Sequence, residues 1–115
     1  MRRGEVRLVD LEPVRGSEAN KRLPAVLVSN DQANAIAGRL GRGVVTVVPL
    51  TSNVERVIAF QALLPASVSG LRIDSKAQAE QIRSVAVERV GPVLGRLSPE
   101  LMHDVDEALR LHLQL

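Results

Sequence analysis

The residues of this chain that could carry out chemistry gather in a polar stretch, Gly16–Arg22, and in a short polar turn, Thr51–Asn53. The first stretch holds a hydroxyl, a carboxylate, an amide and two cations: Ser17, Glu18, Asn20, Lys21 and Arg22. A cation can stabilise the charge that develops on a reacting phosphate, and hydroxyl groups can position it, so this set suits phosphodiester chemistry without a metal ion. Polar loops held by a rigid strand often carry active sites, although many are only solvated connectors.

Other kinds of catalytic site find little support in the sequence. His103 and His112 are the only histidines, and their spacing in one predicted helix places them on roughly opposite sides. They therefore cannot share a metal ion, and solvated side chains are the simpler interpretation. The chain has no cysteine and neither of the glycine-rich phosphate-binding motifs, so we expect no metal and no cofactor.

The strand that follows the polar stretch is expected to position it. Pro24 disfavours a helical conformation at Leu23 and cannot donate to a sheet, and Ala25–Val28 then enter the core. Apolar residues that alternate or are β-branched, bounded by turn signals, predict five strands. These are Glu5–Leu11, Pro24–Ser29, Val44–Leu50, Val57–Leu64 and Val90–Leu97.

Two of these strands carry more specific predictions. In the first, Val6 and Leu8 are expected to face the core, with Glu5 and Arg7 on the other face. In the third, nearly every residue is apolar, which predicts burial on both faces. Pro49 near its end predicts an edge or a bulge there.

Helices are predicted at two places. Asn30 or Asp31 can cap a short helix that runs through Ala37 and ends at Gly38, whereas Ser67–Gly70 is expected to be a turn. Near the C-terminus a serine cap, a proline at the first helical position and an apolar stripe predict a long helix. Its cap, first residue, stripe and end are Ser98, Pro99, Leu101, Val105, Leu109 and Leu113.

One segment, Lys76–Arg89, is ambiguous. Its alanine, glutamine and glutamate residues favour a helix, but its apolar residues make a poor helical stripe. We favour a strand through about Ser84, followed by a short turn. Short strands followed by a late helix predict a mainly β (α+β) fold, a small barrel-like sheet with helices packed outside it.

Composition limits the class of protein. The chain of 115 residues suits one domain, residues 1–115. Phe60 is the only aromatic residue, which counts against a binder that stacks bases on aromatic side chains. Met1–Asp10 shows no signal-peptide pattern, and no apolar run is long enough to span a membrane, so we expect a cytoplasmic protein without a membrane partner.

The net charge of +2 conceals an uneven distribution. Residues 1–97 contain 14 of the 15 basic and 9 of the 13 acidic residues, whereas residues 98–115 are acidic. Most of the basic residues are arginine, whose planar fork suits phosphate recognition. The body of the protein could therefore attract a polyanion, although a solvated surface would have the same composition.

Taken together, several motifs resemble those of the MazF/PemK toxins of bacterial toxin–antitoxin systems. The motifs are RRGE at Arg2–Glu5, GSE at Gly16–Glu18, PAVLVSND at Pro24–Asp31, VVPLTS at Val47–Ser52 and AEQIRS at Ala79–Ser84. They follow one another in the family's order, and the acidic C-terminal helix also fits, so the resemblance covers essentially the whole chain.

This resemblance implies a fold and an activity. The family has an SH3-like, half-open barrel with small flanking helices and a C-terminal helix, and it works as a homodimer. Its members are endoribonucleases that need neither a ribosome nor a metal ion and cut single-stranded RNA at short sequences. The 2′-hydroxyl attacks the adjacent phosphate and leaves a 2′,3′-cyclic phosphate and a 5′-hydroxyl. The implied partners are RNA and an antitoxin with an acidic C-terminal tail, with DNA bound only through the antitoxin.

The resemblance also assigns site residues. The family's catalytic Thr or Ser at the end of the third strand corresponds to Thr51. Its catalytic arginine directly precedes a proline, and here Leu23 occupies that slot while Arg22 lies one residue earlier. Adjacent side chains of an extended segment point to opposite faces, so Arg22 either acts in an altered geometry or the toxin is attenuated. The implied RNA-binding residues are Glu18, Asn20, Lys21, Ser52 and Gln81.

An alternative of a different class stays open. Toxins that share this barrel can poison DNA gyrase by protein–protein contact through the C-terminal segment. The motifs of Gly16–Glu18, Thr51 with Ser52, and Ala79–Ser84 favour the ribonuclease, whereas Leu23 weakens that assignment.

Overall fold

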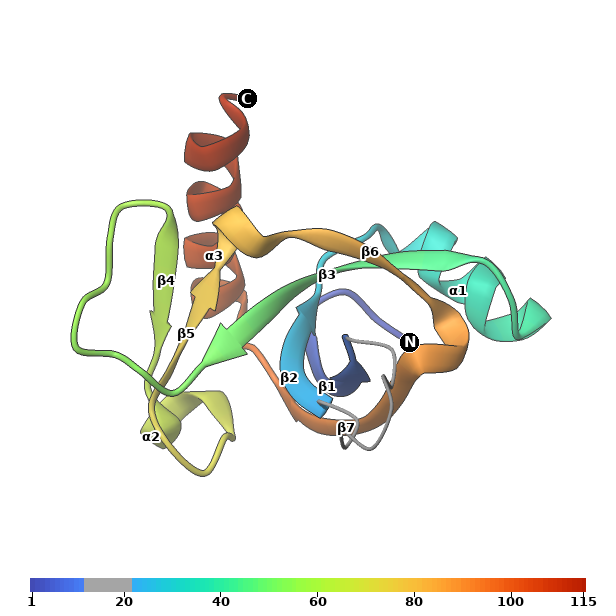
Figure 1. Cartoon of the computed structure of the whole chain (residues 1–115), viewed down its shortest axis with the longest axis horizontal. Helices are drawn as coiled ribbons and strands as arrows, with labels where there is room; N and C mark the ends of the chain where they lie inside the picture. The colour runs from blue at the N-terminus through green and yellow to red at the C-terminus, as the bar shows by residue number, and fades with distance from the viewer. Residues whose placement is uncertain (12–21) are drawn as a thin grey trace, which may run out of the picture.

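The chain folds around a bent antiparallel sheet that stays open rather than closing into a barrel (Figure 1). The structure is a computed structural model that describes residues 1–11 and 22–115. The strands are β1 Glu5–Asp10, β2 Arg22–Leu27, β3 Val44–Thr51, β4 Gln61–Leu64, β5 Ser75–Gln78, β6 Arg83–Ala86 and β7 Val90–Arg96. Their order is β4-β5-β3-β2-β1-β7, with β6 paired to β3. The predicted mainly β fold with a C-terminal helix is confirmed, and the sheet, predicted as a half-open barrel, is open.

Strand β3 is the centre of the sheet because it pairs on one side with β2 and on the other with two strands. Residues Val44–Val47 pair with β6, and the last two residues of β3 pair with β5. Pro49 lies between these two pairings, inside the strand, where the neighbouring strand changes. Proline has no N–H group to donate, so it is tolerated where the hydrogen-bond ladder is interrupted. The sequence predicted an edge or a bulge near Pro49, and the structure has a change of neighbouring strand there, from β6 to β5.

The first strand corrects a prediction. Val6 and Val9 are fully buried while Leu8 is only half-buried, because register shifts against β7 interrupt the alternation of faces. Glu5, which we expected on the polar face, is also buried. At Gly91 of β7 an added Cβ would lie 2.7 Å from the carbonyl oxygen of Leu8, so this close approach requires glycine.

The first helix, α1, spans Asp31–Leu40. Its N-cap is Asn30, whose side chain accepts a hydrogen bond of 2.8 Å from the amide of Ala33. The helix passes through Gly38, so the predicted end was wrong. It stops at Gly41, which has φ 66° and donates its N–H to the carbonyl of Ala37.

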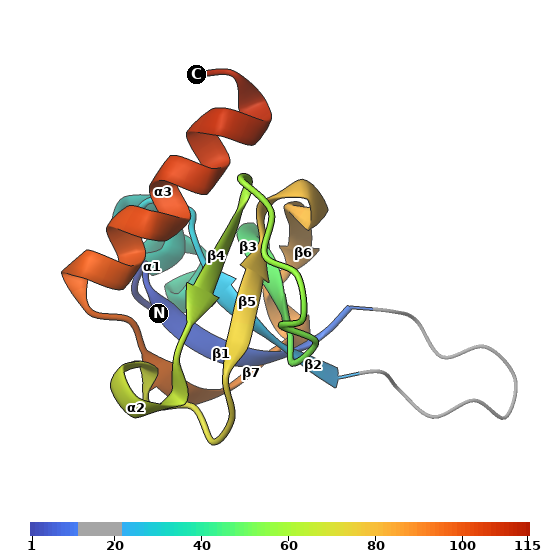
Figure 2. The same cartoon turned by 90° about the vertical axis from the view of Figure 1, so that its left-hand side faces the viewer.

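The C-terminal helix α3 spans Pro99–Leu113, as predicted. The hydroxyl of Ser98 accepts a hydrogen bond of 3.2 Å from the amide of Leu101 and so caps the helix. The helix packs against β4 through a buried face that includes Val105 (Figure 2). No helix in residues 1–11 or 22–115 is long and apolar enough to cross a membrane.

The segment between β3 and α3 forms more and shorter elements of secondary structure than the sequence predicted. Strand β4 begins at Gln61 rather than Val57, because the preceding residues are held by side chains instead of a strand ladder. The expected turn at Ser67–Gly70 is largely the short helix α2, Ala66–Ser69. The ambiguous Lys76–Arg89 splits into β5, β6 and two single 3₁₀ turns, η1 Ala79–Gln81 and η2 Val87–Arg89. The sequence preference for a strand was therefore only partly right.

Two apolar clusters stabilise the sheet from its two faces. One includes Val26, Val48 and Val105 and lies between the sheet and α3. The other includes Val45 and Val47 and lies between β1–β3 and α1. Because β3 supplies residues to both clusters, most of it is buried on both faces, as its apolar sequence predicted.

Candidate active site

A groove of 740 Å³ lies where the start of β2, the end of β3, the loop after α2 and strand β7 come together. These segments lie on the same side of the molecule in Figures 1 and 2. The groove is lined by Leu23 and Pro24 of β2, Leu50, Thr51 and Ser52 at the end of β3, Leu71, Arg72 and Ile73 of the loop, and Val93 and Leu94 of β7, among others. Among the described residues, the groove is therefore mainly apolar, with three hydroxyl groups (Thr51, Ser52 and Ser75), one side-chain amide (Gln78) and one cation (Arg72).

Strand pairing explains why Leu23 and Thr51 share this groove although they lie far apart in the sequence. In the antiparallel pair of β2 and β3, Ala25 is opposite Pro49. The recorded pairs of β2 and β3 end there, and the same register continued by two residues would set Leu23 opposite Thr51; both residues line the groove. The two positions that the family resemblance singled out for catalysis are thus neighbours across one end of the sheet.

Arg22 and Leu23 differ in their relation to the groove. Both belong to β2 and are exposed, and β2 is extended at these residues because it pairs with Asp10 and Val9 of β1. Leu23 lines the groove and Arg22 does not. This is the outcome expected for adjacent residues of a strand, whose side chains project from opposite faces. Leucine, with no charge and no hydrogen-bonding group, therefore occupies the position beside Thr51.

The hydroxyl of Thr51 is held by the turn that follows it. Thr51 Oγ1 accepts a hydrogen bond of 3.3 Å from the amide of Asn53, and the Asn53 side chain accepts one of 3.4 Å from the amide of Glu55. Because the contact to Oγ1 uses only an acceptor position, the O–H group is left to donate to a phosphate oxygen. Ser52 beside it is exposed and offers a second hydroxyl.

Of the remaining predicted site residues, the structure describes Gln81 alone. Gln81 is exposed at the end of η1 and does not line the groove. Glu18, Asn20 and Lys21 fall outside the described residues. Sequence reasoning did not select Arg72, which does line the groove, because a single arginine between two apolar residues gives no motif.

The charged cluster around Glu5 serves a different purpose. The Glu5 carboxylate, only 5% exposed, accepts hydrogen bonds of 3.0 Å from the Arg2 amide, from Arg7 and from Arg96. Burial alone raises the pKa of Glu5, but the Arg2 amide and the Arg7 guanidinium together outweigh it and hold the pKa of this carboxyl below its ordinary value. None of these residues lines the groove, so the cluster ties β1 to β7.

Metal ligands are scarce in the part of the chain that the structure describes. No three histidine or carboxylate side chains there lie close enough together to hold a metal ion. His103 and His112 are both exposed on α3, and the His112 ring lies 5.7 Å from that of Phe60. The groove therefore offers hydroxyls and a guanidinium as its reactive groups.

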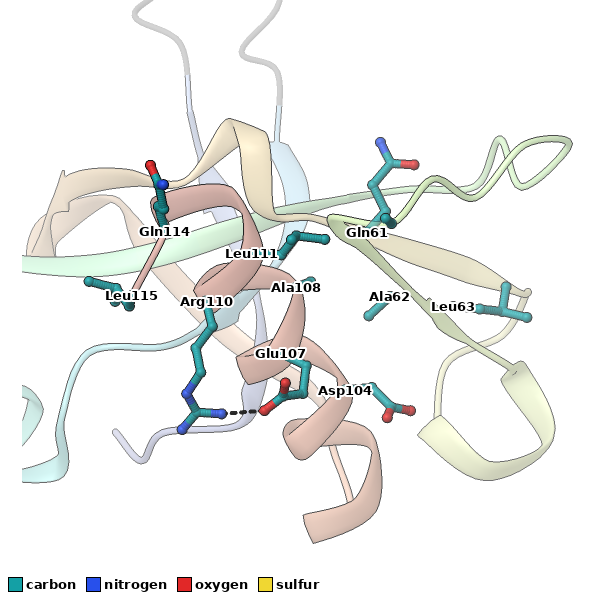
Figure 3. Close-up of a pocket in the computed structure, with 11 residues that line it drawn as sticks. Gln61, Ala62, Leu63, Asp104, Glu107, Ala108, Arg110, Leu111, Gln114 and Leu115 are labelled. Carbon is teal, nitrogen blue, oxygen red and sulfur yellow. Dashed lines mark hydrogen bonds and ion pairs between the residues drawn. The ribbon is translucent and has the colours of Figure 1, made fainter.

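A second hollow lies between α3 and β4 and is shown in Figure 3. Leu63, Leu111 and Leu115 line it, and Arg110 forms an ion pair with Glu107 on the same helix. Neither Thr51 nor Leu23 lines this hollow, so it is distinct from the candidate active site.

Solved structures of small, mainly β proteins share the fold of this chain. A structure described as an endoribonuclease in complex with its cognate antitoxin, from a mycobacterial species, has a TM-score of 0.77 and 25% identity, covering 100% of this chain and 96% of the other. The fold is shared by MazF from Deinococcus radiodurans, with a TM-score of 0.74 and 21% identity, covering 100% and 97% of the two chains.

Sequence comparison identifies the family. The model of the PemK-like, MazF-like toxins of type II toxin–antitoxin systems matches residues 2–113, and the chain belongs to this family. It is 62% identical to endoribonuclease MazF9 of Mycobacterium tuberculosis, over 100% of this chain and 98% of that protein. It is 30% identical to endoribonuclease EndoA of Bacillus subtilis, over 100% and 96%. The resemblance inferred from the sequence motifs is confirmed.

Proposed function

We propose that this chain is the toxin of a type II toxin–antitoxin system and acts in the cytoplasm as an endoribonuclease on single-stranded RNA. The identity of 62% to an endoribonuclease over the whole chain is the observation that carries this proposal. The groove beside Thr51 supports it, because an open groove bordered by hydroxyls and a guanidinium can accept an extended phosphodiester chain.

The groove suits a cleavage reaction in which the RNA supplies its own nucleophile. The 2′-oxygen forms a bond to phosphorus, the bond from phosphorus to the 5′-oxygen breaks, the 2′-hydroxyl loses its proton and the departing 5′-oxygen gains one. The products are a 2′,3′-cyclic phosphate and a 5′-hydroxyl. Thr51 would donate its hydroxyl to a phosphate oxygen and stabilise the negative charge that develops there.

Leu23 affects how fast this reaction can run. In the family pattern a guanidinium stands at this position, and loss of one preorganised donor lowers a rate by about 10²–10³-fold. We propose that the chain is an attenuated member of the family, since Leu23 lines the groove and Arg22 does not. Because no arginine of β2 lines the groove, we also retain a second candidate function, that of a toxin that binds a protein such as gyrase and does not cut RNA.

The test is cleavage of a long single-stranded RNA in the presence of EDTA. We expect products with 2′,3′-cyclic phosphate ends, or the phosphate that forms when these hydrolyse, and no inhibition by the chelator. Thr51→Ala should slow cleavage by about a hundredfold, and Ser67→Ala, an exposed hydroxyl of α2, should leave it unchanged. A requirement for added magnesium would refute the mechanism. Toxicity without any cleavage would instead favour the protein-binding candidate.

We further propose that two copies pair through the hollow between α3 and β4. Leu63, Leu111 and Leu115 are 44%, 56% and 85% exposed there, so apolar side chains of β4 and of the C-terminal segment face the solvent around one hollow (Figure 3). An isologous pair buries the same surface of both copies, and it is the commonest arrangement of oligomers. The antitoxin would bind such a dimer through an acidic tail, as in the MazF family at large.

A further inference from the structure

Among the residues that the structure describes, Arg72 is the one cation that lines the groove beside Thr51. Its side chain is exposed, and it takes part in none of the hydrogen bonds or ion pairs between described residues. The other groove residues around it are largely apolar, including Ile73, Val93 and Leu94. A guanidinium that is exposed and makes no ion pair with the described residues is available to bind an anion.

The loop that carries Arg72 is fixed at both ends. The Leu71 amide donates a hydrogen bond of 3.2 Å to the Ser69 hydroxyl, and the Ala66 amide donates one of 2.8 Å to the Asp74 carboxylate. These contacts tie both sides of Arg72 to α2. A cation on such a loop loses less conformational freedom when it binds a ligand than one on a free loop does.

Close packing holds this loop against β7. Gly95 of β7 lies so near α2 that an added Cβ would be 3.2 Å from the carbonyl oxygen of Ser69. Gly70, with φ 80°, begins the loop in a conformation that favours glycine. The position of Arg72 at the groove is thus set by the packing of α2 on β7.

From these observations we propose that Arg72 binds the RNA backbone at the phosphate that lies beside Thr51, and that it supplies positive charge which Leu23 leaves the groove without. This proposal rests on the proposed ribonuclease function. The fork of N–H groups of a guanidinium can donate two parallel hydrogen bonds to one phosphate. Arg72 reaches the groove from the wall formed by the α2–β5 loop, whereas position 23 belongs to β2, so the two positions approach the substrate from different walls.

The first experiment measures binding alone. The probe is a fully 2′-O-methylated copy of the RNA used for cleavage, which lacks the attacking hydroxyl. Arg72→Ala should weaken binding about ten- to hundredfold and make the slope of log affinity against log salt less steep by about 0.7. Arg72→Lys should keep most of the salt slope because it keeps the charge. Arg42→Ala removes an exposed arginine that does not line the groove and should change neither quantity.

The second experiment measures cleavage by the same variants. Arg72→Ala should lower kcat/KM by at least as much as it weakens binding, and Leu23→Arg added to Arg72→Ala should recover part of that loss. An unchanged thermal midpoint would show that the loop variant still folds. Affinity and salt slope of Arg72→Ala equal to those of Arg42→Ala would overturn the assignment of Arg72.

The two proposals can fail separately. Absence of cleavage by the wild-type protein would refute the ribonuclease, and the 2′-O-methyl probe would still report whether Arg72 binds a phosphate backbone. Wild-type cleavage together with an unaffected Arg72→Ala variant would retain the ribonuclease and refute the role of Arg72.

Discussion

Leu23 is the residue at which the chain departs most clearly from the chemistry expected of its family. It lines the same groove as Thr51 and is 41% exposed, so a larger side chain has room to extend into the groove. A leucine there adds apolar surface to the groove wall but cannot interact with a charged phosphate. We therefore expect the identity of this one side chain to affect the rate of RNA cleavage more than the affinity for RNA.

We expect Leu23→Arg to raise the rate of RNA cleavage by about a hundredfold, because a guanidinium beside Thr51 stabilises charge that develops only in the transition state. The melting temperature should change little, since the residue is exposed and burial of β2 begins at Ala25. Single-turnover cleavage of one RNA by both proteins measures the effect.

The matched control for this substitution is Arg22→Ala in the wild-type background. Arg22 does not line the groove, so we expect cleavage to be little affected. If Arg22→Ala abolishes cleavage and Leu23→Arg leaves the rate unchanged, then Arg22 is the catalytic arginine and the groove must rearrange when RNA binds.

At the scale of secondary-structure elements, side chains hold together pieces that the backbone ladder leaves unconnected. Gln61 accepts a hydrogen bond of 3.2 Å from the Ile58 amide and donates one of 2.6 Å to Glu80, so it links the loop after Thr51 to η1. On the other side of the sheet, Glu5 links β1 to β7 through Arg96. The second contact helps to hold β7, which lines the candidate site with Val93 and Leu94.

The Glu5 cluster should make stability depend on pH in the acidic range. Because folding lowers the pKa of Glu5 from its ordinary value of 4.5, the stabilisation is fully present above that pH and is lost as the pH falls through the folded-state pKa. Glu5→Gln should lower the free energy of unfolding by about 1–3 kcal/mol at neutral pH. The difference from wild type should narrow below about pH 4.5.

Urea unfolding at several pH values measures this effect, with the exposed Glu55→Gln as the control. The control should lose little stability at any pH. A stability difference for Glu5→Gln that stays constant from pH 7 to pH 3 would show that the carboxylate charge does not stabilise the fold.

For the whole molecule, the two hollows lie at different places, and we expect them to have different functions. The groove at the ends of β2 and β3 carries Arg72, whereas the hollow at α3 exposes leucines. The body of the protein is basic and the C-terminal segment is acidic. We therefore expect an acidic antitoxin tail to bind the basic part of the protein, residues 1–97. The exposed leucines at α3 would then contact a second copy of the chain.

We expect the protein to be a dimer at micromolar concentration, and Leu111→Glu to weaken it by burying an unpaired charge at the contact. Light scattering measures the mass of each protein. Val68→Glu, which changes an exposed apolar residue outside this hollow, is the matched control. RNA and an acidic antitoxin peptide should compete for the dimer, and a wild-type monomer or simultaneous binding of both ligands would contradict the proposed assembly.

The sequence alone determined the family, the mainly β fold and the C-terminal helix, because local signals specify each of them. The cap at Ser98, the proline after it and the apolar stripe act within a few residues of one another. The central strand β3 was predictable because its unbroken apolar residues can only be accommodated with both faces covered. The leucine at position 23, where the family motif has an arginine, could also be identified from the sequence, because a motif is compared residue by residue.

Tertiary structure alone decided which residues share a site. The pairing of β2 with β3 brings Leu23 and Thr51 to one groove, and the packing of α2 on β7 brings Arg72 to the same groove. The burial of Glu5 likewise depends on arginines of two strands that close around it. Contacts of this kind join residues that are far apart in the chain, and their free energy depends on the distance and environment of the partners, which no local pattern of residues specifies.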